Sequence, residues 1–134
     1  MNFNFYALSD IGRVRKENQD NYVVIDGKEI GFISGVFDGV GGCDNGKLAS
    51  EIAKETTEKY FLTGNLCDSD DIFKIQKNLE KIIFQINENL ILKTKENNET
   101  LLTTTSILFF YNETYYISHI GDCKIFLLRD KEFC

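Results

Sequence analysis

The sequence contains no proline and no tryptophan, and it has a single methionine and a single histidine. It also lacks any run that approaches the roughly 20 apolar residues of a membrane-spanning helix. The amino terminus has no cationic region followed by an apolar stretch, so a secretory signal is not indicated. The four cysteines are widely spaced and form no C-x-x-C pair. These absences argue against a membrane or secreted protein, and we expect reduced thiols in the cytoplasm.

Concentrated positive charge is missing as well. The 15 lysines and arginines are interleaved with 21 acidic residues, and the formal net charge is −6. We therefore expect neither nucleic acid nor an anionic membrane surface as a partner. At 134 residues, of which 43% are hydrophobic and 27% charged, the chain is long enough for one domain around one core.

Hydrophobic periodicity predicts strands, then two helices, then strands, which is an α+β pattern with antiparallel sheets. Asp26-Gly27 is a turn signal between the second and third strands. Asn112-Glu113 and Gly121-Asp122 are the turns expected between the last three strands. Six strands are expected, over residues 3–9, 21–25, 30–37, 102–111, 115–120 and 124–128.

Two helices are expected between these groups of strands. The first covers residues 48–62 and ends at Gly64-Asn65. The second begins around Ser69, whose hydroxyl can cap it, with Asp70 and Asp71 near the positive end of its dipole. One face of each helix is expected to point into the core: Ala49, Ile52, Ala53, Thr56 and Tyr60 in the first, and Ile72, Ile75, Leu79, Ile82, Ile86 and Leu90 in the second.

A glycine-rich segment follows the third strand. In Val36-Phe37-Asp38-Gly39-Val40-Gly41-Gly42, one carboxylate stands where the backbone can turn sharply and where a ligand can approach closely. This arrangement is typical of a metal or phosphate site. The start of one antiparallel strand lies beside the end of its neighbour, so we expect Asp20 and Asp38 to meet at one edge of the sheet.

A nucleotide-binding P-loop is a remote alternative for the same region. Residues 41–47 fit G-x-x-x-x-G-K between a strand and a helix. However, Leu48 stands where a Ser or Thr would bind magnesium, and Asp44 would repel a polyphosphate. The pattern therefore argues only weakly for a nucleotide.

Four separated segments carry a stronger signal: residues 15–20 (RKENQD), Asp38-Gly39, residues 103–105 (TTT) and residues 119–124 (HIGDCK). In this order, with helices between the second and third, they resemble the PPM (PP2C) metal-dependent serine/threonine protein phosphatases, particularly the bacterial members. The resemblance runs from about Ser9 to Arg129. It implies that the chain is the amino-terminal part of an αββα sandwich.

The resemblance also implies roles for particular residues. In the family, two divalent ions, Mn²⁺ or Mg²⁺, activate a water that attacks phosphorus. Asp38 matches the aspartate that bridges the ions, the Gly39 carbonyl matches a backbone ligand, and Asp20 matches an acid beside the metals. Arg15 matches the arginine that holds the phosphate, a role suited to its two-pronged donor geometry. Gln19 stands where the family most often has Glu.

Other residues near these segments are given structural roles. Asp122 after Gly121 is interpreted as a turn residue, and His119 as a structural histidine on a strand. Cys123 replaces the family's usual Ser and has no neighbouring base, so we do not propose it as a nucleophile. Val40 stands where many members have a His that can protonate the leaving alkoxide.

The later metal aspartates of the family would lie beyond Cys134. Asp20 and Asp38 alone leave two divalent ions under-neutralised, so we expect one ion or none in this chain. We expect a single truncated domain over residues 1–134 that is inactive or impaired by itself. The implied function is dephosphorylation of phosphoserine and phosphothreonine in proteins, opposite a cognate serine/threonine kinase. The alternative is a non-catalytic module that binds a phosphoprotein or another partner.

Overall fold

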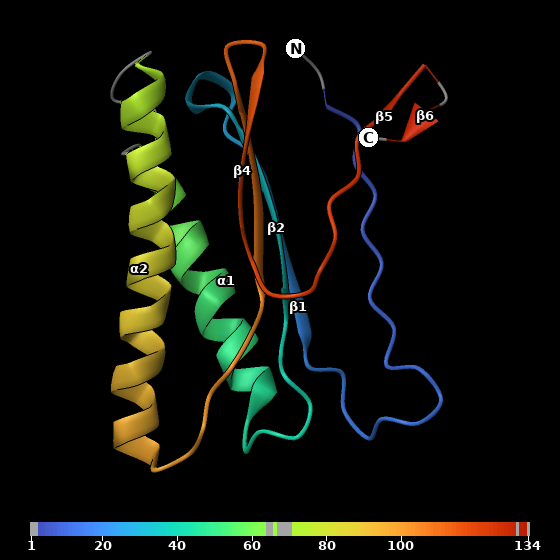
Figure 1. Cartoon of the computed structure of the whole chain (residues 1–134), viewed down its shortest axis with the longest axis vertical. Coiled ribbons are helices and arrows are strands. Elements are labelled where there is room, and N and C mark those ends of the chain that lie inside the picture. Colours follow the sequence, from blue (N-terminus) through green and yellow to red (C-terminus); the bar gives the residue numbers. More distant parts are fainter. Residues whose placement is uncertain (1–2, 64–65, 67–70, 131, 134) are drawn as a thin grey trace.

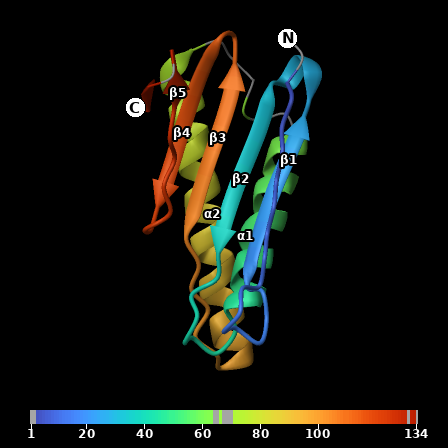
Figure 2. The same cartoon turned by 90° about the vertical axis from the view of Figure 1, so that its right-hand side faces the viewer.

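A four-stranded antiparallel sheet forms the centre of the structure (Figure 1). The structure is a computed structural model, and it describes residues 3–63, 66, 71–130 and 132–133. The strands lie in sequence order across the sheet, as Figure 2 shows. They are β1 (Asp20–Asp26), β2 (Phe32–Asp38), β3 (Thr105–Tyr111) and β4 (Thr114–Ile120).

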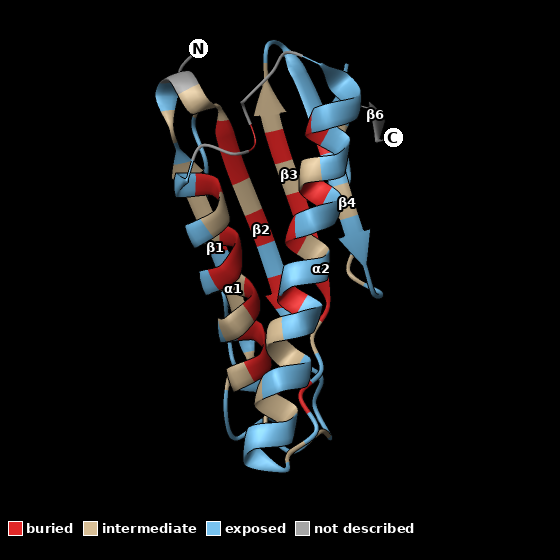
Figure 3. Cartoon of the chain, turned by 90° about the vertical axis from the view of Figure 1, so that its left-hand side faces the viewer, coloured by how far each residue is buried: buried red, intermediate tan, exposed pale blue. Residues whose placement is uncertain are grey.

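Both helices, α1 (Gly46–Leu62) and α2 (Ile72–Asn97), cover the same face of this sheet (Figure 3). The core lies between the two layers. In α2 the predicted stripe is confirmed for its four buried members, Ile75, Leu79, Ile82 and Ile86, whereas Ile72 in the first turn is 53% exposed. None of the helices in the described part of the chain is long and apolar enough to cross a bilayer.

The buried face of α1 is wider than its apolar residues indicated. Ala49 and Ala53 are buried as expected, but so are Ser50 and Thr57. Their hydroxyls donate to backbone carbonyls, Thr57 to Ala53 in its own helix at 2.8 Å, which satisfies them inside the core. The expected Thr56 is buried as well, whereas Ile52 and Tyr60 are only partly buried, and Phe61, which was not expected on this face, is buried.

The helix starts are capped by side chains. Asn45 accepts a hydrogen bond from the Leu48 N–H at 3.1 Å at the start of α1. Asp71 accepts one from the Phe73 N–H at 2.9 Å at the start of α2. The expected cap at Ser69, its neighbour Asp70 and the expected stop at Gly64-Asn65 lie outside the described residues.

Three predicted strand boundaries are wrong. The β1–β2 connection is not a tight turn at Gly27 but contains a short 3₁₀ helix, η1 (Lys28–Ile30), so β2 begins only at Phe32. β3 begins at Thr105, and only an isolated bridge between Gly39 and Thr103 extends its pairing with β2. The chain from Lys124 onward joins no ladder until the two-residue strand β5 (Leu128–Arg129), which pairs with β6 (Glu132–Phe133).

The predicted strand over residues 3–9 is also wrong. This segment is extended, but it crosses the face of the sheet opposite the helices, so its backbone groups cannot join the ladder of an edge strand. Phe3 stacks on Phe32 with ring centroids 4.6 Å apart, and Phe5 lies on the same ring at 6.4 Å. The alternation reflects contacts over a sheet face rather than a paired strand.

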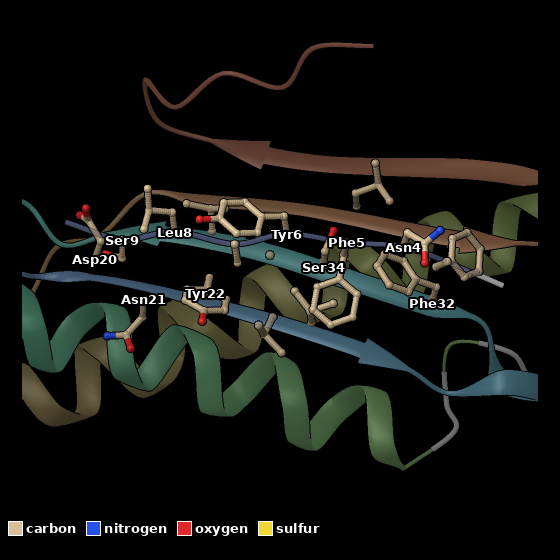
Figure 4. Close-up of a pocket in the computed structure, with 17 residues that line it drawn as sticks. Asn4, Phe5, Tyr6, Leu8, Ser9, Asp20, Asn21, Tyr22, Phe32 and Ser34 are labelled. Carbon is tan, nitrogen blue, oxygen red and sulfur yellow. The ribbon is translucent and has the colours of Figure 1, made fainter. Parts of the chain in front are cut away.

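An apolar hollow of about 580 Å³ lies beneath this segment, against β1 and β2. Figure 4 shows Tyr6 and Leu8 over the two strands, with Asp20 at one end of the hollow and Phe32 toward the other. Several large apolar side chains on this side of the sheet are exposed, among them Tyr22 at 45% and Val36 at 51%.

The end of β2 and the start of α1 approach each other at backbone distance. A Cβ added at Gly39 would lie 2.5 Å from the Gly46 carbonyl carbon and 2.6 Å from the Gln19 carbonyl oxygen. One added at Gly46 would lie 2.9 Å from backbone atoms of both Gly39 and Val40. Because backbone atoms cannot rotate away as a side chain can, both positions require glycine.

Because of this contact, we expect alanine at Gly46 to destabilise the protein, although alanine normally stabilises a helix relative to glycine. Ala is favoured over Gly in a helix by about 1 kcal/mol, but we expect Gly46→Ala to destabilise the protein by about 1–3 kcal/mol because of the clash. The matched control is Lys47→Ala, which removes only an exposed ion pair and should cost less than about 1 kcal/mol. Urea unfolding measures both, and a Gly46→Ala protein as stable as the wild type would contradict the prediction.

Candidate metal and phosphate site

Two carboxylates meet at one edge of the sheet, as the sequence predicted. Asp20 opens β1, Asp38 closes β2, and the two are directly paired in the register. The backbone of Asp38 is held by the residues just before β3: its N–H donates to the Thr104 hydroxyl at 3.0 Å, and its carbonyl accepts from the Thr104 N–H and the Thr103 hydroxyl, each at 2.9 Å. The threonines before β3 therefore position this carboxylate.

The start of β1 is held in a similar way. The Gln19 carbonyl accepts from the Gly39 N–H at 3.2 Å and from the Ser50 hydroxyl of α1 at 2.6 Å. The Asp20 N–H donates to the Asn18 side chain at 3.0 Å. Both carboxylates are thus carried on hydrogen-bonded backbone, and both residues are exposed.

Arg15 lies in the same place. A Cβ at Gly41 would collide with the Arg15 guanidinium, so this cation lies directly over the glycine backbone. Arg15, Asp20, Asp38 and Gly39 together line a hollow of about 250 Å³, which we call the carboxylate hollow. The structure therefore brings together all four residues that the sequence selected.

A third carboxylate and a thiol approach Asp38 from the other side. Gly121 has φ +113° and packs against Thr104, where an added Cβ would lie 2.7 Å from that side chain. This turn places the ligand atoms of Asp38, Asp122 and Cys123 within 4.8 Å of one another. Asp122 was expected only as a turn residue. The signal that could have placed it was the strand order, because β4 ends beside the start of β3 and β3 begins beside Asp38.

The electrostatics of the site favour a cation. The pKa of Asp38 is raised above its ordinary value of 3.8, first by burial, then by the charge and hydrogen bond of Asp20, and then by the charge of Asp122, while Arg15 acts in the opposite direction. Burial and the two neighbouring carboxylates thus outweigh the effect of the Arg15 guanidinium on Asp38. Carboxylate oxygens are the donors that Mg²⁺ and Mn²⁺ prefer, so this donor set fits such ions.

A family model for protein phosphatase 2C matches residues 13–134. The chain belongs to the protein phosphatase 2C family. The match contains Arg15, Asp20, Asp38 and Gly39, and it also contains the turn that carries Asp122.

Curated relatives agree with this assignment. The chain is 28% identical over 125 residues to the serine/threonine phosphatase stp of Listeria monocytogenes serotype 4b, a match that covers 91% of this chain and 48% of that protein. It is 26% identical over 135 residues to a putative protein phosphatase of Mycoplasma pneumoniae, covering 93% of this chain and 50% of the relative. The chain therefore spans about half the length of the curated relatives it matches.

Solved structures share the fold. The serine/threonine phosphatase Stp1 of Staphylococcus aureus superposes with a TM-score of 0.83 at 20% identity, over 94% of this chain and 49% of that one. The phosphatase PstP/Ppp of Mycobacterium tuberculosis superposes with a TM-score of 0.74 at 24% identity, over 95% and 50%. The expected fold, the amino-terminal part of a protein phosphatase 2C sandwich, is confirmed.

His119 has a structural environment in this protein phosphatase 2C chain. Its Nε2 lies 3.0 Å from the Gly121 carbonyl, which can only accept, so Nε2 carries the proton. Its Nδ1 lies 2.9 Å from the Ser106 hydroxyl and accepts from it. Both ring nitrogens are occupied in holding the turn that presents Asp122.

The segment that fits the P-loop pattern is tied to other parts of the chain. The Asp44 carboxylate accepts from the Thr100 N–H at 2.7 Å. The Lys47 ammonium lies 3.2 Å from a Glu17 carboxylate oxygen. These contacts fix the connection between β2 and α1, and they give no support to the nucleotide alternative.

Asp38 is expected to destabilise the metal-free protein. A raised pKa means that the native state holds the proton more tightly than the unfolded chain, so stability falls as pH rises from 3.8 through the raised pKa. Asp38→Asn should therefore raise the melting temperature at pH 7 in EDTA, by about 1–3 °C because exposed carboxylates interact weakly. Near pH 3 the difference should vanish.

Thermal unfolding followed by circular dichroism measures this effect. Glu51→Gln on the exposed side of α1 is the matched control, because it removes one negative charge away from the site. We expect no rise from the control. A drop in melting temperature for Asp38→Asn at pH 7 would show that the three carboxylates do not repel one another in the folded protein.

Proposed function

We propose that this chain hydrolyses phosphoserine and phosphothreonine in proteins with the help of Mn²⁺ or Mg²⁺. The observation that carries the proposal is the convergence of Arg15 with Asp20 and Asp38 in the carboxylate hollow. Hydrolysis of a phosphate monoester needs a bidentate cationic donor for the phosphate oxygens and carboxylates that bind a metal ion beside it. Arg15 is such a donor, and Asp20 and Asp38 are such carboxylates. The family assignment supports the proposal, since protein phosphatase 2C enzymes depend on metal ions and the matched stp relatives are described as serine/threonine phosphatases.

Each residue has a distinct role in this scheme. Asp20 and Asp38 would hold the ion, with the Gly39 carbonyl beside them and the Asp122 carboxylate on the far side of Asp38. The ion, when bound, supplies charge neutralisation and lowers the pKa of water. Arg15 would orient the phosphate, and Gly41 leaves room for its guanidinium. Val40 has no proton to give, so this position supplies no general acid.

The carboxylate count sets the expected strength of the site. Among the described residues, Asp20, Asp38 and Asp122 are the three carboxylates that converge. They balance fewer charges than two divalent ions carry, and Arg15 adds a positive charge beside them. We therefore propose that the chain by itself holds one ion weakly and turns over slowly, as a single domain over residues 1–134.

The setting of this activity follows from the substrate. A phosphatase for phosphoserine and phosphothreonine needs a serine/threonine kinase that makes its substrates, and we propose a cytoplasmic protein that acts opposite such a kinase. The proposed partners are therefore this kinase and the proteins that it phosphorylates.

Hydrolysis of a phosphothreonine peptide tests the proposal. We expect Mn²⁺-dependent release of phosphate below about 1 s⁻¹, and its abolition by Asp38→Ala. Arg15→Ala should lower kcat/KM by about 10- to 100-fold, because a charge-assisted hydrogen bond is worth about 1.5–3 kcal/mol. Arg13→Ala, an exposed cation two residues away, is the matched control and should leave kcat/KM unchanged.

Three results would contradict parts of the scheme. Phosphopeptide binding that is equally tight in EDTA, without phosphate release, would replace the enzyme with the non-catalytic binding module. Turnover well above about 1 s⁻¹ would refute the expected impairment. ATP binding that is lost in Lys47→Ala would revive the P-loop alternative.

A further inference from the structure

The central sheet has two apolar faces, but the helices cover only one of them. On the face away from the helices, Tyr22 lies opposite Val36 in the strand register, and Leu108 lies opposite Ile117. An antiparallel sheet with one solvated face normally alternates apolar and polar residues along each strand. Here the second face is apolar as well. We call it the open face and define it by Tyr22, Val24, Val36, Leu108, Tyr115 and Ile117.

Two extended segments lie over the open face without completing a second layer. Figure 1 shows residues 3–9 and residues 121–127 on the side of the sheet away from the helices. Neither segment belongs to a ladder of the described strands. A hollow of about 580 Å³ lies beneath the first segment, and one of about 370 Å³ lies between the second segment and the strands β2 and β3. Val36 remains 51% exposed and Ile117 remains 48% exposed.

The chain exposes more surface than a compact monomer of its size. Its solvent-accessible area is 9283 Å². A folded monomer of 15.4 kDa is expected to expose about 7,200 Å². The excess of about 2,100 Å² is more than twice the roughly 800 Å² that each partner buries in an interface of standard size. For two chains it amounts to about 4,200 Å², which lies within the roughly 2,000–5,000 Å² of obligate homodimers.

The charge distribution of the open face suits a second copy of the same face. Acidic residues lie at its two ends, Asp20 and Asp38 at one and Asp26 at the other. Between these ends, the positions of the four described strands on this face carry no Asp, Glu, Lys or Arg. A face with charge of one sign would repel its own copy, whereas a neutral apolar face is complementary to itself. Depletion of charge is also typical of the centre of protein interfaces.

We infer that two copies of this chain associate through their open faces, with the helices on the outside of the dimer. Each copy buries apolar side chains that are exposed on its own sheet and on the two extended segments, among them Phe5 and Phe126. The contact is isologous, because the same surface is used by both copies. The inference is independent of the proposed function, since it uses none of the residues proposed to bind metal or phosphate.

Sedimentation velocity of the full chain in EDTA tests the inference. The wild type should sediment as a dimer, and its melting temperature should rise with protein concentration, because unfolding is then coupled to dissociation. Ile117→Lys should raise the dimer dissociation constant at least about 100-fold, since a two-fold interface buries the new charge twice. The matched control is Phe84→Lys on α2. It makes the same change in charge at a side chain that is 66% exposed but lies in the helix layer, and it should leave the dimer intact.

Three outcomes would overturn the inference. The first is a wild-type chain that stays monomeric at its highest soluble concentration. The second is a dimer that survives Ile117→Lys or that Phe84→Lys disrupts equally, because the contact then lies elsewhere. The third is a monomeric wild type that binds a different polypeptide and loses it in Ile117→Lys, which would assign the open face to that partner. If Ile117→Lys fails to fold by circular dichroism, Val36→Lys decides by the same criteria.

Discussion

The site depends on a contact between two backbones. Gly39 at the end of β2 and Gly46 at the start of α1 approach so closely that neither can carry a side chain, and the Gln19 carbonyl lies against the same point. This contact brings the β1 start, the β2 end and the helix start together. Asp20 at the start of β1 and Asp38 at the end of β2 therefore lie side by side. In the connection between Gly39 and Gly46, the backbone of Gly41 lies against the Arg15 guanidinium.

Repulsion between carboxylates near this contact lowers the stability of the metal-free protein. Three carboxylates converge on the edge of the sheet, and the pKa of Asp38 is raised by burial and by its two acidic neighbours. Arg15 offsets this repulsion only in part. Such an arrangement is relieved when a cation binds, and any ion that prefers the folded chain stabilises it by mass action. The carboxylates that destabilise the metal-free protein would therefore stabilise the protein once a cation is bound.

The sequence predicted the parts of the site that depend on local patterning. Asp20 and Asp38 were placed together because strand alternation and an intervening turn define a hairpin, and the register confirms this. Alternation could not tell a paired strand from a segment that lies over a sheet face, so residues 3–9 were misassigned. Asp122 was missed because its place beside Asp38 follows from the pairing of β2 with β3, which no local pattern reports.

The order of the strands has a consequence for how the site assembles. β1–β2 and β3–β4 are hairpins of neighbouring strands, whereas β2 and β3 are separated in sequence by both helices. Local contacts form quickly, and distant ones must first close a long loop. The Asp20–Asp38 pair belongs to the first hairpin, while Asp122 and Cys123 follow the second. The oxygen pair therefore assembles with local structure, and the thiol joins it only when the longest-range pairing of the sheet has formed.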